Sequence, residues 1–128
     1  MATVTPTLQK VHTFADDAMV VTWASLTTTN NYGAPVQMPG RADRSIQLTG
    51  TLGAAGAVTM YGSNVFDPNL ANDADWAILD DAKGNPLVLS TLRIEEIVTL
   101  PLWIRPKITA GDGSTSLTAR LVMKGNLV

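Results

Sequence analysis

Short runs in which apolar and polar residues alternate, each followed by a cluster of turn formers, constrain this fold more than any other feature. In residues 44–51, Ile46 and Leu48 alternate with Gln47 and Thr49, so the apolar side chains of an extended strand would point to one face. Alternating runs separated by Gly, Pro, Asn and Asp are typical of antiparallel sheets with one buried face. The sequence therefore predicts an all-β fold, an antiparallel β-sandwich of about eight strands.

Turn-forming residues divide the chain between these runs. Residues 53–56 and 110–114 are predicted to close hairpins, residues 27–40 to form a long surface loop, and residues 65–75 a second loop with room for one helical turn. Residues 8–19 also fit a helical spacing, which leaves a helix as the alternative there. The predicted strands span residues 7–14, 19–26, 44–51, 57–62, 76–79, 87–89, 94–100, 102–109 and 116–124.

A chain of 128 residues with 45% apolar and only 16% charged residues is long enough for one core and too apolar to be disordered as a whole. We expect residues 1–128 to form a single β-sandwich domain. Residues 1–10, in which Val4 and Leu8 stand among threonines, are either an extended N-terminal arm that adds a strand to a partner or simply the first strand.

The charge pattern argues against two classes of partner. The formal net charge is −2, and Lys and Arg are scattered singly, so no basic stripe is available for nucleic acid or for an anionic membrane surface. No apolar run approaches the length needed to cross a bilayer, and the N-terminus does not resemble a signal peptide. The chain has no cysteine, which excludes disulfides, thiolate nucleophiles and Cys-based zinc sites.

Candidate catalytic groups are few. His12 is the only histidine, and it has neither a nucleophile nor a group of possible ligands beside it in the sequence. The adjacent carboxylates at residues 16–17, 80–81 and 95–96 are expected in turns or on opposite faces of a strand, where two carboxyl groups cannot face each other across a cleft. We therefore predict no catalytic residues, no cofactor and no enzymatic activity.

The loop at residues 65–75 contains oxygen-bearing side chains at short spacing, which suit calcium in principle. It lacks the glycine and the terminal glutamate of the twelve-residue calcium loop, so turn formation is the preferred explanation and no metal site is predicted. Gly50, Gly53 and Gly56 likewise lack the Lys-Ser/Thr that follows a phosphate-binding loop.

The three tryptophans have different expected roles. Trp76, close to Ile78, is expected in the core, whereas Trp103 alternates with Leu102 and Ile104 and should lie on the opposite sheet face, near Arg105. We expect an interface with a capsid or with a second copy to include Val4, Leu8, Trp103 and Arg105.

Several segments, taken in order, resemble small virion proteins of tailed bacteriophages. They are residues 43–53 (DRSIQLTGTLG), 58–64 (VTMYGSN), 76–79 (WAIL), 84–85 (GN), 104–106 (IRP) and 111–113 (GDG). The resemblance covers approximately residues 40–120 and includes capsid decoration, or cement, proteins.

The resemblance implies a jelly-roll-like sandwich that binds the phage major capsid protein on the outside of the head and stabilises it without catalysis. It also implies a homo-oligomer, dimeric or trimeric, located on the virion after assembly in the host cytoplasm. Two alternatives remain open at this stage. One is a carbohydrate-binding β-sandwich with Trp76 or Trp103 exposed, and the other is a phage neck or tail-completion protein that forms rings.

Overall fold

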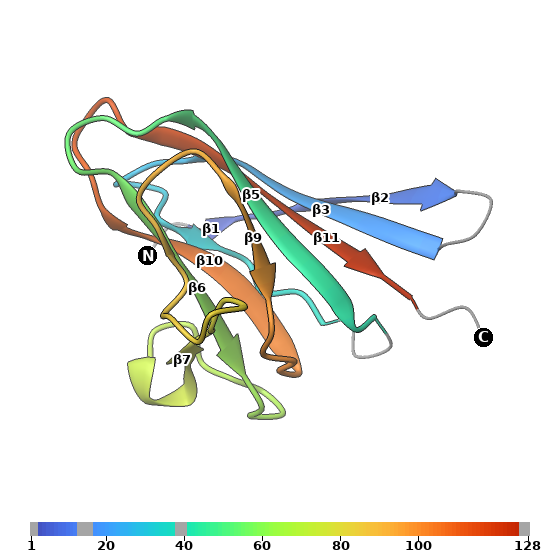
Figure 1. The fold of residues 1–128 in the computed structure, drawn as a ribbon. Coiled ribbons are helices and arrows are strands. Elements are labelled where there is room, and N and C mark those ends of the chain that lie inside the picture. The colour runs from blue at the N-terminus through green and yellow to red at the C-terminus, as the bar shows by residue number, and fades with distance from the viewer. Residues whose placement is uncertain (1–2, 13–16, 38–40, 126–128) are drawn as a thin grey trace.

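Two β-sheets packed face to face form the body of the protein, and all their strand pairs are antiparallel except that of β1 (Thr3–Val4) with β4 (Tyr32–Gly33), which is parallel. A computed structural model describes residues 3–12, 17–37 and 41–125 (Figure 1). Eleven strands lie within these residues, more than the eight or so expected, because several are only two residues long. The predicted all-β sandwich is confirmed.

Sheet B contains the long strands. Its order is β2–β3–β11–β5–β9, and every neighbouring pair is antiparallel. β2 and β9 are the two edges of this sheet. The strands are β2 (Thr7–His12), β3 (Asp17–Leu26), β5 (Asp43–Thr51), β9 (Ile94–Ile97) and β11 (Ser116–Lys124).

Sheet A is built around β6 and β10, which pair along almost their whole length. Its order is β1–β4–β10–β6–β7, with β8 also paired to β6. The strands are β1 (Thr3–Val4), β4 (Tyr32–Gly33), β6 (Ala57–Ser63), β7 (Ala77–Ile78), β8 (Val88–Leu89) and β10 (Trp103–Ala110). A single turn of 3-10 helix, η1 (Asp73–Asp75), precedes β7.

The core lies between the inner faces of the two sheets, with Trp23 as its largest fully buried apolar side chain. The alternation seen in the sequence produces it, because every second residue of β5 and β11 points inward. The other apolar side chains of this core include Val21, Leu26, Ile46, Leu48, Val58, Met60, Leu87, Leu89, Ile104, Leu117, Leu121 and Met123.

Two predicted hairpins are wrong. The turns at residues 53–56 and 110–114 exist, but β5 and β6 lie in different sheets, as do β10 and β11. Both turns are therefore corners at which the chain crosses from one sheet to the other, at the same end of the sandwich (Figure 1). An alternating strand buries one face equally well in either arrangement, so its pattern does not distinguish a hairpin from a corner.

Two further expectations at the N-terminal end of the chain need correction. The helical alternative for residues 8–19 is wrong, because the described part of that segment is the strand pair β2–β3. The long loop predicted for residues 27–40 contains β4, which lies inside sheet A between β1 and β10. Residues 3–4 and 7–12 are strands of the sandwich itself, in sheets A and B respectively.

Among the described residues, no helix is long and apolar enough to span a membrane.

Candidate interaction surfaces

The outer face of sheet A holds a buried cation among aromatic rings. Alternation along β10 turns Ile104 and Ile108 toward the core and Arg105 away from it. Arg105 is nevertheless only 1% exposed, because aromatic side chains surround its guanidinium. Its central carbon lies 4.2 Å from the ring centroid of Trp76, 4.7 Å from that of Tyr32 and 5.7 Å from that of Tyr61. We call these four residues the aromatic box.

The electrostatics of the aromatic box follow from its burial. Loss of water lowers the pKa of Arg105 below its ordinary value, and the nearby Tyr32 and Asp73 oppose that change. Within the described residues, Nε and Nη1 of Arg105 have no hydrogen-bond partner. The ring faces therefore supply the attraction that a carboxylate supplies in most buried arginine sites.

The loop after β6 ends at Trp76 of the aromatic box and is held by its own hydrogen bonds. Nε1 of Trp76 donates to the carbonyl oxygen of Asn69 at 3.0 Å, and the backbone N–H of Asn69 donates to Oδ2 of Asp75 at 2.9 Å. Asn72 caps η1, accepting a hydrogen bond from the N–H of Ala74. Three of the oxygen-bearing side chains of this loop, those of Asn69, Asn72 and Asp75, thus make turn and capping bonds.

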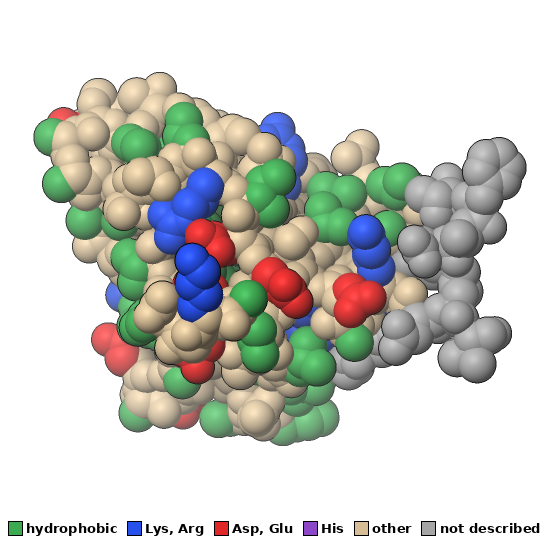
Figure 2. Space-filling view, in the orientation of Figure 1, with side chains coloured by type: hydrophobic (Ala, Val, Ile, Leu, Met, Phe, Trp, Pro, Cys, Tyr) green, Lys and Arg blue, Asp and Glu red, His purple; other side chains and the backbone are tan. Residues whose placement is uncertain are grey.

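One end of the sandwich displays uncharged apolar side chains. Phe66 is 85% exposed, yet its carbonyl oxygen accepts a hydrogen bond from Nε1 of Trp103 at 3.3 Å. Oδ1 of Asn64 accepts a second bond, 2.9 Å, from the N–H of Leu102, which joins this loop to the segment before β10. Figure 2 shows hydrophobic side chains gathered at this lower end. We call the exposed residues Val65, Phe66, Val98 and Leu100 the apolar tip.

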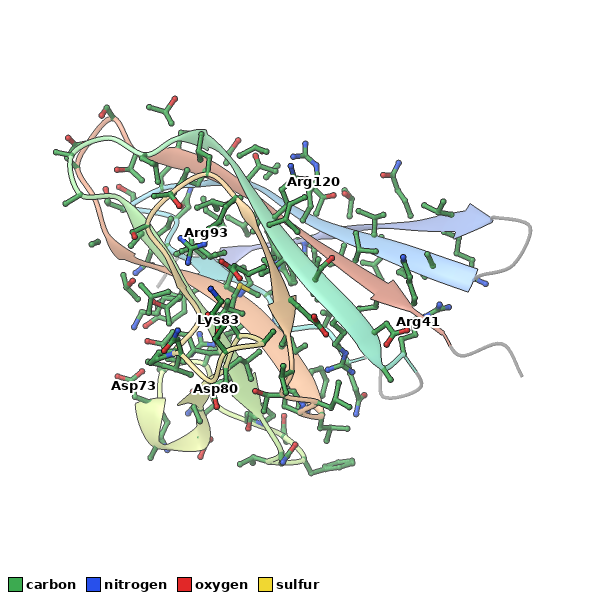
Figure 3. The ribbon with its side chains drawn as sticks, viewed as in Figure 1. Arg41, Asp73, Asp80, Lys83, Arg93 and Arg120 are labelled. Carbon is green, nitrogen blue, oxygen red and sulfur yellow. The ribbon has the colours of Figure 1, made fainter. Side chains whose placement is uncertain are left out.

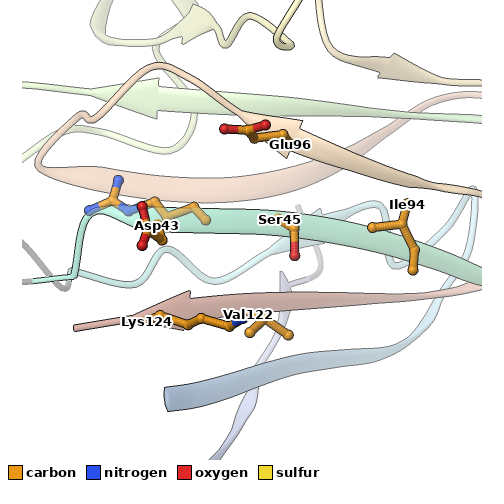
Figure 4. A pocket seen from close by; sticks show the side chains of 7 residues that line it. Asp43, Ser45, Ile94, Glu96, Val122 and Lys124 are labelled. Atoms are coloured by element: carbon orange, nitrogen blue, oxygen red, sulfur yellow. The ribbon is translucent and has the colours of Figure 1, made fainter. Parts of the chain in front are cut away.

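A shallow hollow lies on the outer face of sheet B (Figure 4). Its volume is about 390 Å³, and it opens between β9, β5 and the end of β11. Asp43 and Glu96 bring carboxylates to it, and Lys124 brings an amine. Its lining residues are Asp43, Arg44, Ser45, Ile94, Glu96, Val122 and Lys124.

The neighbouring carboxylates whose side chains the structure describes make separate contacts. Oε1 of Glu95 accepts a hydrogen bond from Nε of Arg93 at 2.7 Å, whereas Glu96 lines the hollow. The two neighbours therefore point in different directions, as expected for a strand. Asp81 accepts hydrogen bonds from the N–H groups of Lys83 and Asn85 and shapes their turn. Of the charged side chains labelled in Figure 3, Asp80 and Lys83 belong to one turn, and the others come from different parts of the chain.

In a chain without cysteine, a metal site would be built from His, Asp and Glu side chains. No group of three or more such side chains that suits a metal ion occurs among the described residues. The backbone of His12 ends β2, and its side chain lies outside the described part, as does Asp16.

The predicted interface residues occupy four different environments. Leu8 is 51% exposed on the edge strand β2, and Val4 is partly buried against the core. Trp103 is partly buried on the outer face of sheet A, near Arg105 as predicted. Arg105 is not accessible in this structure, because the rings of the aromatic box surround it. Trp76 is buried as expected, at 8% exposure, but against Arg105 and outside the cluster between the sheets.

Sequence reasoning missed the apolar tip. The signal was present, because Val65 and Phe66 are consecutive large apolar residues at the start of an otherwise polar loop. Large apolar residues on a surface loop usually contact a partner or the protein core. The sequence alone does not say that the loop after β6 and the segment before β10 meet at the same end of the molecule.

The architecture defines this chain as a β-sandwich protein. No protein-family model matches it, and no curated protein matches it in sequence. Among solved structures it is similar to the SPBc2 prophage-derived protein YomS, with a TM-score of 0.59 and 10% sequence identity, over 90% of this chain and 99% of that chain. At this identity the likeness shows a shared fold.

Proposed function

We propose that this chain is a non-enzymatic structural protein of a tailed-phage virion, which binds the outer surface of the assembled capsid and stabilises the head. Its partner is the major capsid protein, and its place is the capsid surface after assembly in the host cytoplasm. The apolar tip is the single observation that carries the proposal. The order of phage-like sequence motifs supports it, and the fold shared with a prophage-derived protein agrees with it.

The apolar tip has the properties of an interface centre. Interface cores are enriched in aromatic residues and depleted of charge, and the tip residues are two valines, a phenylalanine and a leucine. The backbone at Phe66 is held by one hydrogen bond from Trp103 and by the Asn64–Leu102 hydrogen bond. A fixed backbone loses little conformational freedom when a partner binds, which favours affinity.

The sugar-binding alternative receives less support from these surfaces. The ring of Trp76 is covered and stacks on Arg105, so its face is not open to a sugar ring. Trp103 is partly buried, with its Nε1 bonded to the loop.

Co-sedimentation tests the proposal. Purified protein is mixed with expanded heads that lack decoration, and the heads are pelleted through a sucrose cushion. We expect the protein to appear in the pellet at a saturable ratio to the capsid protein. Protein that stays in the supernatant at every head concentration would defeat the proposal.

A further inference from the structure

The four sheet edges of this sandwich differ in how they are protected against pairing with another chain. Sheet A ends in two-residue strands, β1 on one side and β7 and β8 on the other. Very short edge strands offer few free backbone groups and discourage pairing. Sheet B ends in longer strands, β2 and β9, so its edges are the ones available for extension.

β9 is protected by charge. Two of its four residues are Glu95 and Glu96, so a second β9 placed beside it would bring four carboxylates into one short ladder. Like charges that oppose each other across strands are destabilising. Charged residues on an edge strand are a recognised device against association.

β2 has less of this protection than β9. It is six residues long and pairs with β3 without a register shift. Its side chains from residue 7 to residue 11 are exposed, and they include Leu8 and Val11. Lys10 is the one formal charge among these five residues. We infer that β2 is a self-association edge, at which two copies of this chain pair β2 with β2 across a twofold axis and join their B sheets into one.

The sequence of β2 selects one register for this pairing. A twofold axis perpendicular to the sheet keeps the outer faces of both copies on the same side, so the axis must pass beside one central residue. Centring on Lys10 would oppose two ammonium groups, and centring on Leu8 would bring Pro6, which has no N–H, into the ladder.

Centring on Gln9 avoids both problems. Gln9 then opposes Gln9 of the second copy, Thr7 opposes Val11, and Leu8 opposes Lys10, whose aliphatic stem can cover it. All five exposed positions are paired, and no like charges oppose each other. This inference gives a form to the homo-oligomer that the phage resemblance implies, and it does not depend on head binding.

Single-cysteine variants test the register, because the chain has no cysteine of its own. Opposed residues of an antiparallel pair lie within disulfide distance, so oxidation of Gln9→Cys should give a covalent dimer on a non-reducing gel. Lys10→Cys, which would face Leu8, and Ile94→Cys on β9 are the controls and should cross-link far more slowly. Equal rates for Gln9→Cys and Ile94→Cys would overturn the inference.

Two substitutions at one position test the charge argument in solution. Leu8→Glu places a carboxylate opposite Lys10 of the second copy twice per dimer, and Leu8→Lys places an ammonium there. From the energies of cross-strand pairs, the dimer dissociation constants of the two variants should differ by about tenfold, with Leu8→Glu the tighter. Sedimentation velocity over a concentration series measures this difference. Equal dissociation constants, or a protein that stays monomeric at about 1 mM, would contradict the inference.

These experiments use no heads, so they separate the inference from the proposed function. A β2-paired dimer that fails to bind heads would defeat the capsid proposal alone. Head binding by a protein that does not pair through β2 would defeat this inference alone.

Discussion

The guanidinium of Arg105 stacks on the indole of Trp76, with 4.2 Å between the central carbon and the ring centroid. Arg105 comes from the middle of β10, whereas Trp76 ends the loop that follows β6. The contact therefore fixes a surface loop on the outer face of sheet A. Because the same loop begins with Val65 and Phe66, the aromatic box also supports the apolar tip.

Trp76→Ala should destabilise the protein strongly. The substitution removes a buried aromatic ring, which costs about 3–5 kcal/mol in other proteins, and uncovers Arg105. Trp103→Ala is the matched control and should cost less, because Trp103 is only partly buried. Urea unfolding followed by circular dichroism gives both free energies. A smaller effect at Trp76 than at Trp103 would show that the aromatic box does not hold the loop.

Arg105→Met should change the free energy of unfolding by no more than about 1 kcal/mol, because it fills similar space and removes a charge buried at a desolvation cost. Arg105→Ala should cost about 2–4 kcal/mol, because it leaves a cavity beneath Trp76. The same urea titration compares the two variants. If Arg105→Met were as damaging as Arg105→Ala, the cation–π attraction would outweigh the cost of burying the charge.

The carboxylate of Asp112 should make the stability of the folded protein depend on pH in the acid range. Its carboxylate accepts hydrogen bonds from the N–H of Ala54 and from the N–H and Oγ of Ser114, which lower its pKa to about 2 from 3.8. Because the folded pKa lies below the ordinary value, the stabilisation is complete above about pH 4 and is lost as the pH falls through about 2.

Thermal unfolding at pH 6, 4, 3 and 2 measures this effect. Wild-type protein should be more stable than Asp112→Asn at pH 6, and the difference should shrink between pH 4 and pH 2. Asp67→Asn, in the loop after β6, serves as the control for a general change of charge. A constant difference between wild type and Asp112→Asn over this range would exclude the carboxylate as the cause.

Gly33→Ala should destabilise the fold where β4 enters sheet A. A Cβ at Gly33 would lie 2.5 Å from Cγ of Pro106 and 2.7 Å from Cδ1 of Trp23, and overpacking of this kind typically costs about 1–3 kcal/mol. Gly113→Ala should be nearly neutral, because nothing lies within 4 Å of its Cβ position. Comparable melting temperatures for the two variants would mean that β4 shifts freely to admit the methyl group.

Much of the fold follows from local pattern. The strands at residues 44–51, 102–109 and 116–124 are visible because an apolar residue at every second position requires one buried face. The local pattern does not determine which strands pair with each other. The corner at residues 110–114 looks like a hairpin in sequence, since its turn chemistry is the same for both arrangements, and only the packing of the two sheets decides between them.

The candidate surfaces depend on contacts between distant residues, which explains why they were only partly predicted. Trp103 and Arg105 share a face, and their alternation in β10 shows it. The burial of Arg105 depends on Tyr32 and Trp76, which lie far from it in the sequence. The apolar tip likewise needs the loop after β6 to meet the segment before β10, a meeting that no local pattern encodes.

A binding isotherm on undecorated, expanded heads tests the central claim most directly. Wild-type protein is compared with Phe66→Asp, which puts a charge on the apolar tip, and with Ala55→Asp, which puts the same charge in the corner at the other end of the sandwich. We predict that Phe66→Asp weakens binding at least tenfold, as expected for loss of an aromatic interface residue, while Ala55→Asp binds like the wild type. Equal binding by all three proteins, or no binding by any of them, would contradict the account.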